Sequence, residues 1–170
     1  MSYPINHIGL TVPDLAAATK WYIEVLGFAI LTPSAVAHRD PNGNDGPFMK
    51  TSLELFPPEL QMISTAFLTS GNGVGLELFE FDPKITDDTK ADLARDYKRG
   101  GVFHFAVTVP DFDATLDKAI QTGAKKIGNT YNSMGAKIQY IADPWGNTVE
   151  LLSMSFERLL ANGGHVQMLK

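Results

Sequence analysis

The chain has 170 residues, of which 44% are hydrophobic and 19% charged, as is typical of one compact domain or two small modules that share a core. Its net charge of −5 argues against a nucleic-acid-binding surface, and the absence of cysteine excludes disulfides, thiolate zinc sites and cysteine nucleophiles. We see neither a signal peptide nor an apolar run long enough to span a bilayer. We therefore expect a cytoplasmic protein that binds no nucleic acid and no membrane.

The first predicted strand lies in the phrase HIGLTVPDL at residues 7–15. Its apolar residues alternate with others, so Ile8 and Leu10 would face one side of a sheet and His7 the other. Asp14 can cap a helix predicted over residues 15–26, where apolar residues follow helical spacing up to Gly27. Three further strands are predicted at residues 28–34, 60–71 and 74–81.

The phrase returns as HFAVTVPDF at residues 104–112, with five of its nine positions identical. Asp111 can cap a second helix, which begins at Phe112 and stops at Gly123. Strands are again predicted behind it, at residues 125–131, 136–143 and 148–154. Each half of the chain therefore reads as a β-α-β-β-β unit, which indicates an old duplication.

This pattern predicts an α+β fold built from two βαβββ modules. The first module takes residues 1–82 and the second residues 102–155, with a connecting helix within residues 83–101 and a C-terminal tail over residues 156–170. Residues 33–58 are polar, rich in Gly and Pro, and have no counterpart in the second half. We predict that they form a loop insertion that acts as a lid or binding loop.

Each module carries one histidine in its first strand and one glutamate in its last: His7 with Glu77, and His104 with Glu150. Half-exposed strand residues would explain one such pair, but not its repetition at equivalent positions. Carboxylates among hydrophobic residues are usually paired or bound to metal. Two neutral imidazoles and two carboxylates suit one divalent transition metal ion, whether Ni, Co, Zn, Mn or Fe.

The stretches NHIGLTVPDLAAATKWYIEVLGF, GVGLELFEF, VFHFAVTVPDF and YIADPWGNTVELL resemble the vicinal oxygen chelate superfamily. That group includes glyoxalase I, methylmalonyl-CoA epimerase, extradiol dioxygenases, fosfomycin-resistance transferases and bleomycin-resistance proteins. The resemblance implies a cupped, mostly antiparallel sheet around a metal, with His7, Glu77, His104 and Glu150 at the ligand positions. It also implies a homodimer that binds a small-molecule substrate.

Two His and two Glu ligands resemble glyoxalase I most closely. The resemblance implies a lyase or isomerase that acts on a small substrate with adjacent oxygens through a metal-stabilised enediolate. Glu150 is then the first candidate for the catalytic base and Glu77 the second. Two features depart from the relatives: Thr11 stands where glyoxalase I usually has an arginine, and Glu77 stands where methylmalonyl-CoA epimerase commonly has a glutamine.

Two other functions stay open. One is an Fe(II) extradiol-type dioxygenase, although such enzymes use two His and one Glu. The other is a non-catalytic drug-binding protein of the bleomycin-resistance type, although those proteins have generally lost the ligands. If the DPWGN turn at residues 143–147 is a simple hairpin, Gln139 shares the face of Glu150 and can contact substrate.

Overall fold

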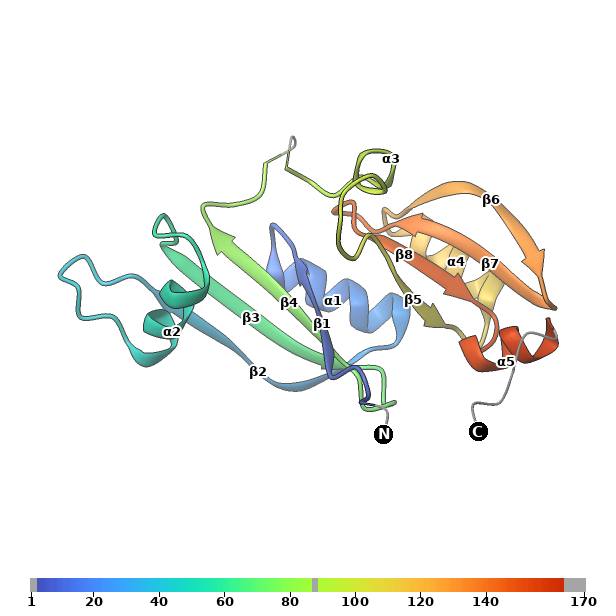
Figure 1. Ribbon diagram of the computed structural model, residues 1–170, viewed down its shortest axis with the longest axis horizontal. Coiled ribbons are helices and arrows are strands. Elements are labelled where there is room, and N and C mark those ends of the chain that lie inside the picture. The colour runs from blue at the N-terminus through green and yellow to red at the C-terminus, as the bar shows by residue number, and fades with distance from the viewer. Residues whose placement is uncertain (1–2, 87–88, 164–170) are drawn as a thin grey trace. The chain divides into compact units, whose positions relative to one another are not determined.

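The computed structural model describes residues 3–86 and 89–163, and its chain divides into two compact units, Met1–Lys90 and Ala91–Lys170 (Figure 1). Each unit holds a four-stranded mixed sheet, in the order β1-β4-β3-β2 in the first and β5-β8-β7-β6 in the second. In both sheets the first strand pairs parallel with the last, and the other neighbours pair antiparallel. The repeated topology confirms the predicted plan of two βαβββ modules.

The first unit follows the predicted element order, with one helix added. Its elements are β1 (His7–Thr11), α1 (Leu15–Leu26), β2 (Ala29–His38), α2 (Pro47–Leu55), β3 (Met62–Thr69) and β4 (Gly75–Asp82). Helix α1 begins where the Asp14 side chain accepts a hydrogen bond from the backbone N–H of Ala17, at 2.9 Å. It ends at Gly27, whose φ of 73° lies in the left-handed region. The two residues that the sequence marked as start and stop are confirmed.

The second unit contains α3 (Leu93–Asp96), β5 (Phe105–Thr108), α4 (Phe112–Gln121), β6 (Lys125–Ser133), β7 (Ala136–Ala142), β8 (Thr148–Leu152) and α5 (Phe156–Asn162). Asp111 repeats the part of Asp14, because its side chain accepts from the backbone N–H of Ala114 at 3.1 Å. Across the described parts of both units, no helix has the length and apolar character needed to cross a membrane.

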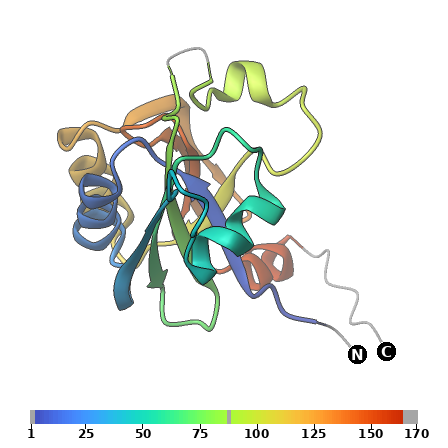
Figure 2. The same cartoon turned by 90° about the vertical axis from the view of Figure 1, so that its left-hand side faces the viewer.

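The predicted loop insertion at residues 33–58 is wrong over most of its length. Strand β2 continues through it to His38 by pairing with β3, and Pro47–Leu55 forms α2. Met49 anchors this helix in a cluster with Leu60 and Ile63. Figure 2 shows α2 and α1 on opposite sides of the first sheet. The polar composition of this segment predicted a loop, because α2 buries only one of its faces and the other faces carry polar side chains.

The predicted connecting helix within residues 83–101 is also shorter in the structure. Two of its residues, 87 and 88, lie outside the described ranges, and the described remainder is helical only at Leu93–Asp96. The Asp92 side chain caps it by accepting from the backbone N–H of Ala94. No residue of α3 is buried, so no packing stabilises further turns.

Candidate metal centre

In the first unit, β1 and β4 bring His7 and Glu77 together. Glu77 pairs with Gly9, and His7 lies two residues earlier on the same strand, so both side chains share one face. The Nε2 atom of His7 lies 3.6 Å from a carboxylate oxygen of Glu77. We call this side the site face of the sheet.

Gly75 lets the imidazole of His7 lie over β4. It pairs with His7 across the parallel strands, and a Cβ atom added to it would lie 3.2 Å from the Cβ of His7. That separation is tighter than ordinary van der Waals contact, so a larger residue would displace the histidine or the strand. The glycine therefore belongs to the site as the surface beneath His7.

In the second unit, His104 and Glu150 repeat this arrangement. His104 lies just before β5, and Ala106, two residues later, pairs with Glu150. The Nε2 atom of His104 lies 3.3 Å from a carboxylate oxygen of Glu150, and the two side chains are 25% and 14% exposed. The site face of the second sheet therefore carries the same pair at the same place.

The two pairs have the donor chemistry of a transition-metal site. Two donors that each lie ~2.1 Å from a shared ion, at an angle of about 90° to 109°, are themselves ~3.0 to 3.4 Å apart. The His–Glu distances of 3.6 and 3.3 Å lie close to that range. Within the described ranges, no three His, Cys, Asp or Glu side chains gather into a metal-holding group. Each unit by itself thus offers two candidate ligands, one nitrogen and one oxygen.

One atom of the second pair lacks a hydrogen-bond partner. The Nδ1 atom of His104 is buried, and no described group bonds to it. The ring contacts two aromatic side chains instead, with its centroid 4.6 Å from that of Phe103 and 5.3 Å from that of Tyr140. Aromatic packing therefore orients this imidazole.

Tyr140 is a site residue that the sequence analysis missed. It pairs with Glu150 across β7 and β8, and its ring meets His104 edge-on. Burial, followed by the charges of Glu150 and Tyr131, raises the pKa of Tyr140 to about 12. Tyr131 pairs with Ile138 and so lies on the same face. Burial is the larger cause that raises the pKa of Tyr131, and the negative charge of Glu150 is the smaller one. Two phenols of raised pKa thus share the sheet face of Glu150.

The predicted shared face of Gln139 and Glu150 is wrong. Gln139 pairs with Leu151, so its side chain points to the opposite face of the sheet. There it is fully buried: its carboxamide accepts from the Thr130 hydroxyl at 2.7 Å and donates to the carbonyls of Ile127 and Tyr140. The cause is the turn after β7. Five residues lie between the paired Ala142 and Thr148. With this odd number Tyr140 pairs with Glu150, whereas an even number of turn residues would have put Gln139 on the face of Glu150. Gln139 therefore joins β6 to β7, and the suggested substrate contact loses its support.

Helices outside the repeated pattern cover part of each site face. In the first unit α2 covers Ile63, Phe79 and Phe81, and the last two are on the same side of β4 as Glu77. In the second unit Leu159 of α5 packs against the cluster of Ala136, Ile138 and Leu152, on the face of Glu150. Each His–Glu pair therefore lies on a sheet face that is partly covered by a helix outside the repeated pattern.

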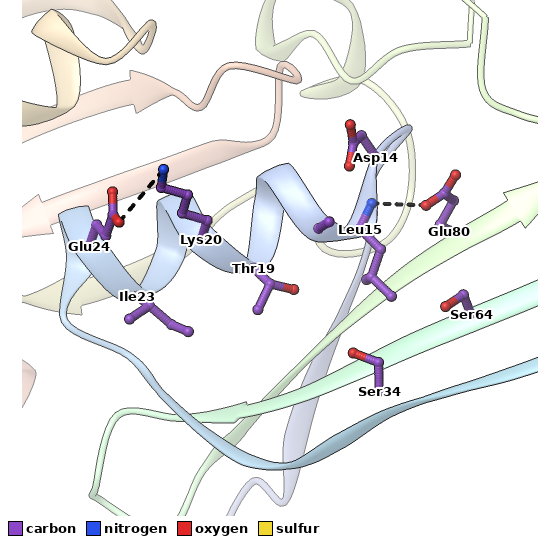
Figure 3. A pocket seen from close by; sticks show the side chains of 10 residues that line it. Asp14, Leu15, Thr19, Lys20, Ile23, Glu24, Ser34, Ser64 and Glu80 are labelled. Atoms are coloured by element: carbon purple, nitrogen blue, oxygen red, sulfur yellow. Dashed lines mark hydrogen bonds and ion pairs between the residues drawn. The ribbon is translucent and has the colours of Figure 1, made fainter.

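The first unit has a separate hollow of about 650 Å³ on its α1 side (Figure 3). Its charged side chains already have partners. Glu80 accepts from the backbone N–H of Leu15 and pairs with Lys84, both at 2.9 Å, and Lys20 pairs with Glu24 at 4.0 Å. Glu80 points to the face opposite Glu77, three residues away on the same strand. The hollow is thus distinct from the candidate metal centre, and acidic side chains outnumber basic ones in its lining, with Asp14, Glu24 and Glu80 against Lys20.

Comparison with known proteins agrees with this architecture. The family model described as the glyoxalase/bleomycin resistance protein/dioxygenase superfamily matches residues 4–151. A 2-epi-5-epi-valiolone epimerase from Actinomyces is 29% identical over 156 residues, which cover 88% of this chain and 79% of the epimerase.

Among solved structures, a glyoxalase family protein from Bacillus cereus has a TM-score of 0.69 at 18% identity, covering 89% of this chain and 94% of its own. The trypanothione-dependent glyoxalase I of Leishmania major has a TM-score of 0.59 at 19% identity, covering 96% and 95%. These two likenesses show the fold. With the family model matched over most of its length, the chain belongs to the glyoxalase/bleomycin resistance protein/dioxygenase superfamily.

Proposed function

We propose that this protein is a divalent-metal-dependent lyase or isomerase that acts on a small substrate with adjacent oxygens. The observation that carries the proposal is the repeated His–Glu pair, found at the same sheet position with the same facing atoms in both units. A binding protein built on this fold has no need of four metal-type donors, and a structural role explains neither their repetition nor their facing donor atoms.

His7, Glu77, His104 and Glu150 would hold one ion, within one chain or between two. Each donor would lie ~2.0–2.2 Å from it, and Ni, Co, Zn, Mn and Fe all accept such a set. When bound there, the ion would act as a Lewis acid that stabilises negative charge on the oxygens beside the reacting carbon.

The residues of the chain would move the proton. Glu150 is our first candidate for the base that takes a proton from the carbon next to a carbonyl, and Glu77 can return it or take its place. Tyr140 supports this assignment, since it pairs with Glu150 across β7 and β8 and its pKa of about 12 keeps the phenol beside that carboxylate neutral. A relative named as an epimerase also favours proton transfer at carbon over oxygen insertion.

Metal analysis and turnover test the proposal together. The purified protein should contain one divalent ion per His–Glu quartet, and His7→Ala or His104→Ala should remove most of it without unfolding the sheets. Substrates to assay are 2-epi-5-epi-valiolone and the methylglyoxal–glutathione adduct, with exchange of the substrate C–H for solvent deuterium as a direct readout of the base. Catechols with added Fe(II) test the dioxygenase alternative.

Glu150→Gln is the informative variant, because it keeps the shape of the side chain but removes the base. We expect metal to be retained in part, with both turnover and deuterium exchange reduced by at least ~100-fold. Glu54→Gln, on the exposed side of α2, is the matched control and should behave as the unaltered protein. Full turnover by Glu150→Gln would transfer the role to Glu77. A metal-free protein that binds an organic ligand tightly would instead support the binding-protein alternative.

A further inference from the structure

The residue before His7 makes a contact that has no counterpart in the second unit. The side-chain oxygen of Asn6 lies 2.8 Å from the Nδ1 atom of His7. The backbone of Asn6 is itself fixed, because its carbonyl accepts a hydrogen bond from the N–H of Gly75 at 2.8 Å. A carboxamide oxygen can only accept, so this contact requires the proton of the neutral imidazole to be on Nδ1.

The second histidine is held differently. Phe103 precedes His104 and contacts it only through its ring, and the Nδ1 atom of His104 is buried without a hydrogen-bond partner among the described residues. The duplication thus kept the two histidines and changed what orients them. A hydrogen bond fixes the proton of His7, whereas aromatic packing leaves the proton of His104 unassigned.

We propose that Asn6 is a positioning residue that selects the Nδ1–H tautomer of His7. In this tautomer Nε2 carries a free lone pair, and that atom is the one facing Glu77, 3.6 Å away. A metal ion binds neutral imidazole through such a lone pair, and the partner of the second ring nitrogen typically sets both tautomer and ring orientation. The first unit would therefore hold its nitrogen ligand in the metal-binding tautomer before the ion arrives. This consequence for metal binding rests on the proposed function, but the tautomer itself does not.

The tautomer can be read in the metal-free protein. With ¹⁵N-labelled histidine, long-range ¹H–¹⁵N correlation at a pH well above the imidazole range distinguishes a protonated nitrogen from an unprotonated one. We expect His7 to show Nδ1–H in the unaltered protein and in Asn6→Asp, which keeps an acceptor at the same place. Asn6→Ala should shift it towards a mixture of tautomers, while Asn129→Ala, at an exposed asparagine of β6, should leave it unchanged. An Nε2–H tautomer for His7 in the unaltered protein would overturn the proposal.

Binding of Co²⁺, followed by its visible absorption, tests the consequence without turnover. Loss of the Asn6 oxygen should weaken Co²⁺ binding by ~10-fold, at the low end of the 10- to 100-fold typical of such partners because Asn6 is exposed. Asn6→Asp should restore the affinity. Equal affinities for Asn6→Ala and Asn129→Ala would refute the positioning role. If the unaltered protein bound no Co²⁺ or other divalent ion, the proposed function would fail, and the tautomer measurement would still decide the role of Asn6.

Discussion

Gly75 sets how closely the imidazole of His7 approaches β4. Its φ is ordinary for a strand, so alanine is tolerated by the backbone there, but the added methyl would lie 3.2 Å from the Cβ of His7. At the residue scale, the candidate site therefore depends on the lack of a side chain at Gly75 as well as on the candidate ligands. The second unit has Thr148 at the equivalent position of β8, so its histidine rests on a different surface.

We predict that Gly75→Ala weakens metal binding several-fold while leaving the protein folded. The methyl group would tilt His7 away from Glu77, and a metal site tolerates little displacement of a ligand. Calorimetric titration with Co²⁺ measures the effect, and circular dichroism checks the fold. Gly100→Ala is the control, because nothing lies within 4 Å of the added atom. Equal affinities for the two variants would contradict this role of Gly75.

Helix α2 shows how an added element shapes a duplicated one. It covers one end of the first site face through Met49, whose side chain is fully buried with Leu60 and Ile63. In the second unit the covering helix is α5, which follows the last strand in the chain. Its Leu159 packs against the cluster of Ala136, Ile138 and Leu152. In both units, a helix outside the repeated pattern thus borders the open surface beside the candidate ligands.

We predict that Met49→Ala lowers the free energy of unfolding by about 2–5 kcal/mol. It removes a buried side chain and leaves a cavity that the sheet cannot close. Urea unfolding measures the change, and Lys50→Ala, at an exposed position of the same helix, should stay within ~0.5 kcal/mol of the unaltered protein. A loss below ~1 kcal/mol for Met49→Ala would mean that α2 is not packed against the sheet.

The short helix α3 has a pH-dependent contribution. Hydrogen bonds from Arg95, the backbone of Asp92 and Arg99 lower the pKa of Asp96 from 3.8 to about 2. Because the folded-state pKa is the lower one, the stabilisation is present above pH ~3.8 and disappears as the pH falls through about 2. The contribution is small, within the ~0.2–1 kcal/mol of exposed ion pairs.

We therefore predict that Asp96→Asn lowers stability at pH 7, and that its difference from the unaltered protein narrows below pH 4. Thermal unfolding at a series of pH values measures this difference, and a ¹³C titration of the carboxyl group measures the pKa itself. Asp117→Asn, at an exposed position of α4, serves as the control. A constant difference across the series would show that the carboxylate charge of Asp96 is not involved.

At the scale of the whole molecule, we predict a homodimer at micromolar concentration, as the family resemblance implies. Sedimentation measures the assembly, and a monomer under all conditions would contradict the prediction. Mixing His7→Ala with His104→Ala then shows how the ligands are shared. If one ion takes a His–Glu pair from each of two chains, mixed dimers regain one complete site and bind metal. If each chain completes its own site, mixing restores nothing.

The sequence by itself determined the repeated βαβββ plan and the two His–Glu pairs, but not α2 or the extent of α3. These depend on local rules: the Pro-Asp caps at residues 14 and 111 start helices, alternation places His7 and Glu77 on a face, and the repeat doubles every inference. The strands were predicted within a few residues for the same reason. Each depends on the chemistry of neighbours along the chain, which the sequence displays directly.

Only the tertiary structure decided which side chains accompany the ligands. The odd length of the turn at residues 143–147 turned Gln139 away from Glu150 and placed Tyr140 beside it. Met49 packs with Leu60 and with Ile63 of β3, and this contact stabilises α2 in a segment whose polar composition predicted a loop. These features depend on strand register and on contacts between distant residues, and a one-residue change in register reverses the facing of a whole strand.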